Sequence, residues 1–286
     1  MDSKNLAWLI RRHGIEMTHL SQGSHIGAIL SVADIIAVLY ASVANVDSEN
    51  PKMVTRDRII LSKGHAGAAI YAALAERGFF PVPELKTHYK NGSKLSGHVS
   101  HKGVPGVEFS TGSLGHGLSV ASGMAMAAKL DGKPQTVFCV LGDGECDEGA
   151  VWECALTSNH FKLDNLVAII DHNKMQSLDY CENTISLEPL AEKWKAFGWN
   201  IITIDGHNHS ELLESLQYAK NNRNGRPTIV IANTIKGKGI SFMENNILWH
   251  YRFPHEGEEY DQSLKELNVI KPDNCIDPYV NQEVQI

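Results

Sequence analysis

Two uninterrupted apolar runs constrain the fold of this chain more than any other feature of its sequence. Residues 136–141 and 166–171 are mostly β-branched or apolar and contain neither Gly nor Pro. Such runs are typical of buried strands. The intervening residues 148–160 have the composition of one helix, so the three segments predict a βαβ unit with parallel strands.

Polar residues follow both of these strands. Gly142-Asp143-Gly144 comes after the first strand, and Asn173 lies just past the second. Both side chains therefore meet at the carboxyl edge of one parallel sheet, where open α/β sheets bind ligands. A carboxylate, an amide oxygen and one main-chain carbonyl, assigned here to Met175, suit a Mg²⁺ ion that shares a diphosphate; Ca²⁺ or Mn²⁺ could substitute. The competing interpretation is an ordinary tight turn, because Asp and Gly also dominate turns.

The remaining sequence alternates strand-like and helix-like segments, which predicts an α/β fold: a doubly wound, mostly parallel sheet with helices on both faces. Residues 81–112 are rich in Gly, Pro, His and Ser, and we expect them to form a wall of the site. One domain is expected over 1–255, followed at 256–286 by a polar tail or a partner-contacting arm. Further strands are expected at 59–62, 199–204 and 227–233, and helices at 5–19, 31–43, 66–76, 118–130, 188–197 and 210–222.

The composition argues against several classes of protein. The 286 residues carry a net charge of −7, which gives no basic face for nucleic acid. The five cysteines form no C-x-x-C pair, which is typical of free thiols in a reducing compartment. The chain opens without a signal peptide and no apolar run reaches the length of a membrane span. We therefore expect a cytoplasmic protein that does not enter a membrane.

Fourteen histidines are an unusually high number for a chain of this length. Five of them lie in loops that join predicted elements, namely His25, His65, His98, His116 and His250. A histidine taken singly is more often structural, but this clustering favours a shared site for proton transfer at neutral pH. His207 and His209 follow a predicted strand, and we expect them to be solvated loop residues rather than metal ligands.

Several short motifs together resemble the transketolase family of thiamine-diphosphate enzymes. Residues 142–176 resemble the family's thiamine-diphosphate motif, and the similarity extends over about residues 5–255. It implies transfer of a two-carbon ketol unit from a ketose to an aldose, with thiamine diphosphate and Mg²⁺ as cofactors. The other matching motifs are Gly23-Ser-His25, Leu61-Ser-Lys-Gly-His65-Ala, Gly97-His98, Thr111-Gly-Ser-Leu-Gly-His-Gly117, Thr234-Ile-Lys-Gly-Lys-Gly239 and Trp249-His250.

The resemblance also implies roles for individual residues. Asp143, Asn173 and the Met175 carbonyl would hold the metal. Glu148 and Glu153 would line a subunit interface and help to relay protons, although acids near a helix start also complement its dipole. The implied active-site histidines are His25, His65, His98 and His250. The implied cofactor-binding residues are His65, Gly112, Ser113, Leu114, Gly142, Asp143, Gly144, Glu148, Asn173, Lys236 and His250.

The resemblance covers only the diphosphate-binding half of a fused transketolase. We therefore expect a separate C-terminal subunit, with a pyrimidine-binding and a C-terminal domain, in an α₂β₂ assembly. The family's Gly-His-Pro-Glu is Gly97-His98-Val99-Ser100 here, so the wall facing the acceptor sugar would differ.

Two alternatives stay open. One is a subunit of a related enzyme with an unusual acceptor or of deoxyxylulose-phosphate-synthase type, and the other is a non-catalytic binding module.

Overall fold

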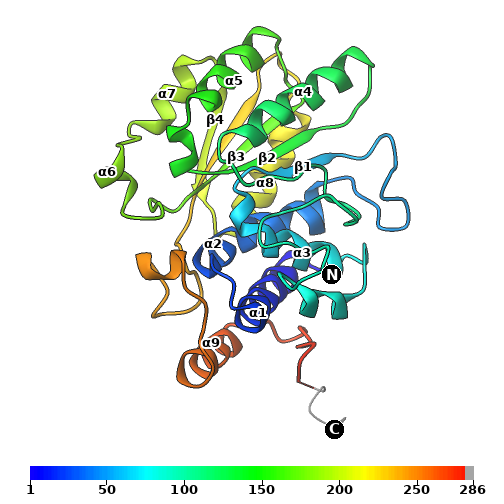
Figure 1. The fold of residues 1–286 in the computed structure, drawn as a ribbon. Helices are drawn as coiled ribbons and strands as arrows, with labels where there is room; N and C mark the ends of the chain where they lie inside the picture. Colours follow the sequence, from blue (N-terminus) through cyan, green and yellow to red (C-terminus); the bar gives the residue numbers. More distant parts are fainter. Residues whose placement is uncertain (281–286) are drawn as a thin grey trace.

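A five-stranded parallel sheet forms the centre of the computed structural model, which describes residues 1–280 (Figure 1). Its spatial order is β1-β2-β3-β5-β4, and every neighbouring pair is parallel. The predicted strands are all confirmed, each end lying within one residue of its expected place. The strands are β1 (Arg58–Leu61), β2 (Val137–Gly142), β3 (Leu166–His172), β4 (Asn200–Asp205) and β5 (Thr228–Asn233).

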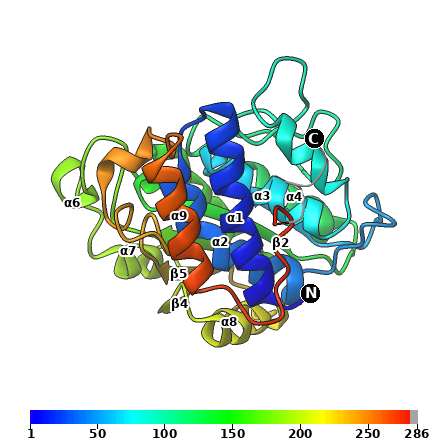
Figure 2. The same ribbon diagram turned by 90° about the horizontal axis from the view of Figure 1, so that it is seen from below.

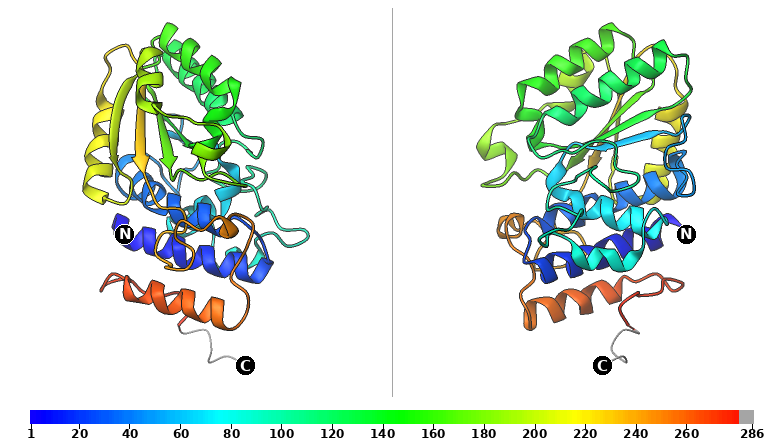
Figure 3. Two further views of the ribbon diagram at one scale, coloured as in Figure 1. Left: turned by 90° about the vertical axis from the view of Figure 1, so that its left-hand side faces the viewer. Right: turned by 45° about the vertical axis from the view of Figure 1, so that its right-hand side comes forward.

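Helices cover both faces of the sheet, because successive side chains of a strand point to opposite faces (Figure 3). In β2, Phe138 and Val140 join one core, while Cys139 and Leu141 join the other. The predicted doubly wound architecture is therefore confirmed. One face packs on α4 (His116–Leu130), α5 (Gly149–His160) and α7 (Leu190–Ala196), and the other on α2 (Ile26–Val38), α3 (Gly67–Glu76) and α8 (His209–Asn221).

Two further helices add an outer layer on one side of the molecule. Helix α1 (Ser3–Ser21) packs on α2 and α3, and α9 (Glu258–Val269) lies alongside α1 (Figure 2). Short helical turns complete the described elements at Leu39–Val43, Gly64–Ala66, Val82–Thr87, Gly144–Asp147, Cys181–Thr184 (α6) and Ile247–His250.

Helix α2 differs most from its expected extent. It begins at Ile26 rather than at residue 31, and it includes Gly27, where a Cβ atom would lie 3.2 Å from the carbonyl oxygen of Trp249. With the turn that follows, it forms an 18-residue segment, Ile26–Val43, that could span a membrane by length and composition. The expectation that no such run exists is wrong. Of this segment 89% is buried inside the protein, as in a core helix.

The crossover helix α5 begins one residue later than expected. Residues Gly144–Asp147 form a short 3₁₀ turn, and Glu148 is the N-cap of α5 with an extended backbone (φ −73°, ψ 126°). The turn keeps the chain close to the end of β2 before the helix leaves it. Glu153 therefore lies in the second turn of α5.

Part of the segment after residue 256, which was expected to be a polar tail or a partner-contacting arm, is helix α9 and packs on this chain. Tyr260, Leu264 and Leu267 recur at helical spacing and pack against the cluster that contains Trp8 of α1. The Trp8 indole N–H also donates a 2.9 Å hydrogen bond to the carbonyl of Leu267. A domain boundary at residue 255 and a partner contact by this segment stay predictions. Residues 281–286 of the expected tail lie outside the described residues.

Asp277 and Tyr279, near the end of the described chain, form hydrogen bonds and an ion pair with α1. The Tyr279 hydroxyl hydrogen-bonds Nδ1 of His13 at 2.7 Å, and Nε2 of His13 bonds Glu76 of α3 at 2.7 Å. The Tyr279 ring also lies 4.1 Å from the Arg12 guanidinium, which pairs with Asp277 at 3.2 Å. Because His13 is fully buried, both of its ring nitrogens depend on these partners.

Replacing Tyr279 by Phe should therefore lower the free energy of unfolding by about 1–2 kcal/mol, because a buried ring nitrogen of His13 loses its partner. Urea unfolding measures this loss. The matched control is Tyr218→Phe on α8, where the side chain is 59% exposed, and its stability should stay that of the wild type. An unchanged urea midpoint for Tyr279→Phe would show that this segment does not hold α1.

Candidate active site

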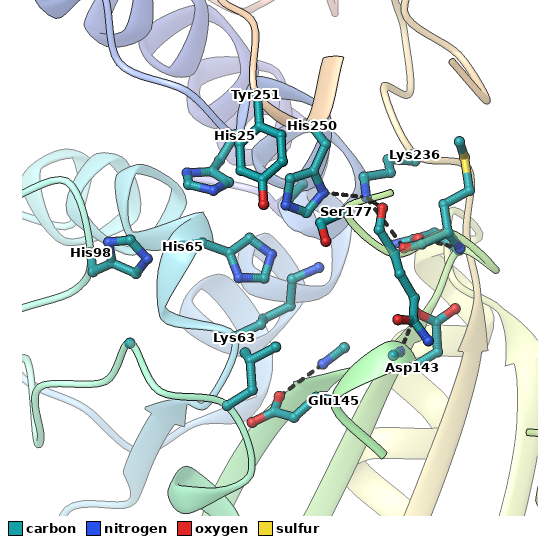
Figure 4. A pocket seen from close by; sticks show the side chains of 18 residues that line it. His25, Lys63, His65, His98, Asp143, Glu145, Ser177, Lys236, His250 and Tyr251 are labelled. Carbon is teal, nitrogen blue, oxygen red and sulfur yellow. Dashed lines mark hydrogen bonds between the residues drawn. The ribbon is translucent and has the colours of Figure 1, made fainter. Parts of the chain in front are cut away.

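The carboxyl ends of β1, β2 and β3 border a cavity of about 230 Å³ (Figure 4). It contains most of the residues that the sequence predicted. Four of the candidates do not line it and are exposed, so the structure does not bring them to the cavity: Ser113, His116, Glu148 and Glu153. The predicted residues that do line it are His25, His65, His98, Gly112, Leu114, Gly142, Asp143, Gly144, Asn173, Met175, Lys236 and His250.

Four imidazoles lie close together on one side of this cavity. The ring centre of His25 lies 5.2 Å from those of both His65 and His250, and 5.6 Å from that of His98. His25 has a left-handed backbone (φ 77°) at the N-cap of α2, and its N–H donates a 3.0 Å hydrogen bond to the His250 carbonyl. A non-glycine residue keeps this conformation only where its surroundings impose it. His25 is therefore held at the centre of the cluster.

Burial lowers the pKa of three of these histidines. The pKa of His25 is lowered to about 4 and that of His250 to about 3, with Lys236 and Lys63 adding to the effect of burial. Burial also holds the pKa of His65 well below its ordinary value. All three are neutral at pH 7, so each can accept a proton while its other nitrogen donates one.

These pKa shifts predict that acid destabilises the chain. Histidines of the unfolded chain take up a proton near pH 6.5, whereas folded His25 and His250 do so only near pH 4 and 3. The free energy of unfolding should thus fall below pH 6.5, by at most about 1.4 kcal/mol per pH unit for each histidine. Urea unfolding at pH 7, 6 and 5 measures the slope. A His25→Asn/His250→Asn variant should show a shallower slope, and an equal slope would contradict the assignment.

A buried ion pair, which sequence analysis missed, lies between the sheet and α2. Lys63, just past β1, donates to the carboxylate of Asp171 in β3, and both side chains are almost inaccessible to solvent. The hydroxyls of Ser31 (2.6 Å) and Thr234 donate to the same carboxylate. Burial alone would raise the pKa of Asp171, but the charge of Lys63 and these hydrogen bonds hold it below its ordinary value. The sequence offered one sign of this pair, because Asp171 is a carboxylate at the end of the apolar run 166–171.

The three predicted metal ligands lie together at the sheet edge. Asp143 accepts hydrogen bonds from the N–H groups of Gly144 (2.8 Å) and Lys174, and Asn173 Oδ1 accepts from the N–H of Met175 at 3.1 Å. Burial raises the pKa of Asp143; His172 opposes this effect and the charge of Asp171 adds to it. Within residues 1–280 Asp143 forms no ion pair, so its charged form needs a counter-ion.

The donor set at this edge fits Mg²⁺. One carboxylate, one amide oxygen and one main-chain carbonyl are hard oxygen donors that leave positions for phosphate oxygens and water. In the described part of the chain no three His, Cys, Asp or Glu side chains gather to hold a metal by themselves. A cation at this edge would therefore be shared with another ligand.

Lys236 lies between the histidines and the sheet edge that carries the predicted metal ligands. Its ammonium donates to the carbonyl oxygens of Met175 (3.2 Å) and Gln176 (3.0 Å), and it bonds Nδ1 of His250 at 2.8 Å. Burial lowers the pKa of Lys236 to about 8, and the like charge of Lys63 adds to the shift. The side chain is still mostly protonated at pH 7, which places a positive charge beside the cavity.

A second buried carboxylate that sequence analysis missed, Glu145, organises the glycine loops. It accepts hydrogen bonds from the backbone of Gly115 (2.9 Å) and Gly142 (3.1 Å) and from the Ser62 hydroxyl. Burial raises its pKa. Gly115 has a positive φ (83°), and a Cβ atom there would lie 2.7 Å from the side chain of Glu148. The glycine-rich loop is thus tied to the end of β2 at the point where α4 begins.

His207 and His209 are not solvated loop residues, and that expectation is wrong. They bond the two carboxylate oxygens of Asp34 in α2 at 2.7 and 3.1 Å, and Arg11 pairs with the same carboxylate at 2.6 Å. Nε2 of His207 also accepts a 2.8 Å hydrogen bond from the N–H of Ile235. These hydrogen bonds join the turn after β4 and the start of α8 to α2. The two histidines have a structural role.

Comparison with known proteins identifies the family. Residues 3–267 match the family model of the transketolase thiamine diphosphate binding domain. The chain belongs to the transketolase family. Two similar transketolase-family proteins are shorter than fused transketolases. A 6-deoxy-6-sulfo-D-fructose transketolase subunit from Clostridium sp. is 42% identical over 250 residues, covering 87% of this chain and 90% of that protein. An apulose-4-phosphate transketolase subunit from Actinobacillus succinogenes is 44% identical over 246 residues, covering 86% and 88%.

Longer transketolases match over part of their length. Human transketolase is 39% identical over 248 residues, which is 86% of this chain but 39% of that protein. The crystal structure of Campylobacter jejuni transketolase superposes with a TM-score of 0.86 at 30% identity, over 93% of this chain and 42% of that one. The resemblance, the fold and the transketolase-type transferase subunit predicted from the sequence are therefore confirmed.

The two buried aspartates of the site should respond differently to removal. Asp171→Ala leaves the Lys63 charge buried without its partner and should destabilise the chain by about 3–5 kcal/mol. The matched variant Asp143→Ala removes a carboxylate whose charge is unfavourable in the folded chain, so its effect should stay within about 1 kcal/mol. Urea unfolding of the two variants measures the difference. Equal losses would contradict the roles given to these carboxylates.

Proposed function

We propose that this transketolase-family chain transfers a two-carbon ketol unit from a ketose to an aldose, as one subunit of a heteromeric enzyme. The observation that carries the proposal is one cavity with four imidazoles facing an oxygen-rich edge of the sheet. Cleavage of a carbon–carbon bond beside a hydroxyl needs proton acceptors at the oxygen and a cofactor held in a fixed position.

Mg²⁺ and thiamine diphosphate would bind along the sheet edge. Asp143, Asn173 and the Met175 carbonyl would hold the metal, and the positive charge at the edge would attract the diphosphate. The backbone at Gly144 and the His65 and His250 side chains would contact the diphosphate. When bound, the cofactor supplies an electron sink for the broken bond. The edge supports this proposal because Mg²⁺ is usually shared between one or two carboxylates and substrate phosphates.

The histidines would move the protons. His25 lies at the centre of the cluster and is neutral at pH 7, so it can accept a proton from a sugar hydroxyl and return it. His98 is exposed and approaches from the loop that forms the outer wall, so it would contact the sugar rather than the cofactor. Their neutral forms also serve as hydrogen-bond donors to oxygen atoms that gain charge.

A second subunit would complete the site. The Clostridium and Actinobacillus relatives are named as transketolase subunits, and this chain covers about nine-tenths of each. We therefore propose a partner with a pyrimidine-binding and a C-terminal domain, in a cytoplasmic α₂β₂ assembly. The exposed Ser113, Glu148 and Glu153 would face that assembly, which explains why they lie outside the cavity of the single chain. The five cysteines are free and buried, as expected in a reducing compartment.

A sugar other than the common pentose and hexose phosphates is the second candidate for the substrate. The relatives named above are a 6-deoxy-6-sulfo-D-fructose and an apulose-4-phosphate transketolase subunit. The segment that departs from the family wording directly follows His98, which lines the cavity. It is held in place there: Val99 N–H donates to the Gly64 carbonyl at 3.0 Å, and Ser100 N–H to the Tyr71 hydroxyl at 2.8 Å. No observation in the described residues favours a deoxyxylulose-phosphate synthase or a non-catalytic module.

Ketol transfer should occur only when the chain is mixed with its C-terminal subunit, thiamine diphosphate and Mg²⁺. The assay uses a panel of ketose donors and aldose acceptors, phosphorylated or not, and follows the products by mass spectrometry. Asp143→Ala should reduce transfer to background, because the metal loses its carboxylate ligand. The matched control Asp164→Ala removes a carboxylate just before β3, at the opposite end of this strand from the cavity, and should keep wild-type activity. Activity of the chain alone would contradict the two-subunit proposal.

A further inference from the structure

The segment after the last 3₁₀ turn carries a tyrosine whose backbone is fixed on both sides. His250 is held by Lys236 (2.8 Å), and its carbonyl accepts the 3.0 Å hydrogen bond from His25. On the other side, the Arg252 guanidinium lies 5.0 Å from the ring centre of Trp249 and pairs with Glu259 at 2.5 Å. Tyr251 between them therefore has little freedom to move away from the cavity.

The side chain of Tyr251 itself is open to solvent at the cavity. It lines the cavity and is 59% exposed, although Trp249 and His250 just before it are buried. Its ring centre lies 4.6 Å from that of His250 and 5.8 Å from that of His25. Figure 4 shows its hydroxyl pointing into the cavity between the histidines. Tyr251 thus stands at the boundary between the imidazole cluster and solvent.

The hydroxyl of Tyr251 has no hydrogen-bonding partner in the part of the chain that the structure describes. The charged side chains deeper in the cavity, in contrast, all have partners. Lys63 is paired with Asp171. Lys236 donates to two carbonyl oxygens, and Glu145 accepts backbone hydrogen bonds. A phenol can donate one hydrogen bond and accept another. The free hydroxyl is therefore available to a ligand.

We propose that Tyr251 determines which sugars the site accepts, an inference that rests on the proposed ketol transfer. The reacting end of the sugar lies among the imidazoles, and the rest of its carbon chain leads past Tyr251 toward solvent. The phenol donates a hydrogen bond to a hydroxyl on this outer part of an aldose, and the ring limits the width of the mouth. The ligand class is a polyhydroxylated aldose of four or more carbons.

The competing occupant of this position is the partner subunit, whose surface would cover the phenol. Two observations favour the sugar. The hydroxyl points into the cavity, and the ring contacts two of the histidines proposed to act on the sugar. A residue that serves subunit docking would affect assembly, whereas a residue that recognises the sugar affects the choice between acceptors. The two roles therefore predict different measurements.

The test compares Tyr251→Phe with the wild type in the assembled complex with thiamine diphosphate and Mg²⁺. The matched control is Tyr218→Phe, which removes the hydroxyl of an equally exposed tyrosine (59%) on α8. With hydroxypyruvate as the donor, kcat/KM is measured for a long aldose, such as D-ribose 5-phosphate or D-erythrose 4-phosphate, and for glycolaldehyde. Glycolaldehyde is too short to reach the phenol. Titration of the aldose, of the cofactor and of the partner subunit gives three binding constants independent of turnover.

The expected result for Tyr251→Phe is a roughly three- to tenfold fall in the ratio of kcat/KM for the long aldose to kcat/KM for glycolaldehyde, the worth of one neutral hydrogen bond. The binding constant of the long aldose weakens by the same factor, while cofactor binding and assembly are unchanged. Tyr218→Phe behaves as the wild type.

Three results would overturn the inference. An unchanged ratio with normal assembly leaves the proposed function intact but removes Tyr251 from sugar recognition. An unchanged ratio with weaker assembly assigns Tyr251 to the partner interface. No transfer by the wild-type complex with any sugar refutes the proposed function, and this inference falls with it.

Discussion

The site depends on one interaction above all, the buried pair of Lys63 and Asp171. Both side chains are withdrawn from water, so neither charge is tolerated without the other. The same carboxylate accepts hydrogen bonds from Ser31 of α2 and from Thr234 just after β5. The pair therefore fixes α2 and the ends of three strands relative to one another. Most residues of the cavity lie in these segments or just after them, and Asp143 follows β2, which lies between β1 and β3 in the sheet.

The electrostatics of the cavity follow from this arrangement. Burial is the main reason why the pKa values of His25 and His250 are low, and the nearby charges of Lys63 and Lys236 lower them further. Neutral rings thus lie beside fixed positive charge, an environment that suits an anionic cofactor and proton transfer to sugar oxygens. Asp143 is a buried carboxylate without an ion-pair partner among residues 1–280, and a divalent cation would balance its charge. Together, the positive charge and the oxygen donors of the cavity support the proposed binding of a metal diphosphate.

Local patterns were sufficient to predict the strands and the sheet edge. Unbroken apolar runs identified β2 and β3, and the polar residues that follow a parallel strand belong at its carboxyl edge, so Asp143 and Asn173 were expected to meet. The loop positions and the resemblance placed the four histidines. The ends of the helices were harder to predict. Helix α2 includes Gly27, and the reason for a glycine there is the close approach of the Trp249 backbone, which is distant in the sequence.

The missed residues are those whose environment depends on distant parts of the chain. Asp171 accepts hydrogen bonds from Ser31 and Lys63, which lie 140 and 108 residues away in the sequence. No local pattern reveals such contacts. In the sequence, nothing distinguishes the buried carboxylate of Glu145 from an exposed acidic residue in a turn. Tyr251 lies outside every apolar periodicity, and only its place beside His25 and His250 shows that it faces the cavity.

The central claim is that the sheet edge holds a metal diphosphate, and anomalous diffraction tests it most directly. Crystals of the complex with its partner subunit, grown with thiamine diphosphate and Mn²⁺ in place of Mg²⁺, would locate the metal without ambiguity. The account predicts one Mn²⁺ peak bonded to Asp143, Asn173 and the Met175 carbonyl, with diphosphate oxygens completing its shell. A cofactor bound at this edge without a metal, or a peak bonded to other residues, would contradict it.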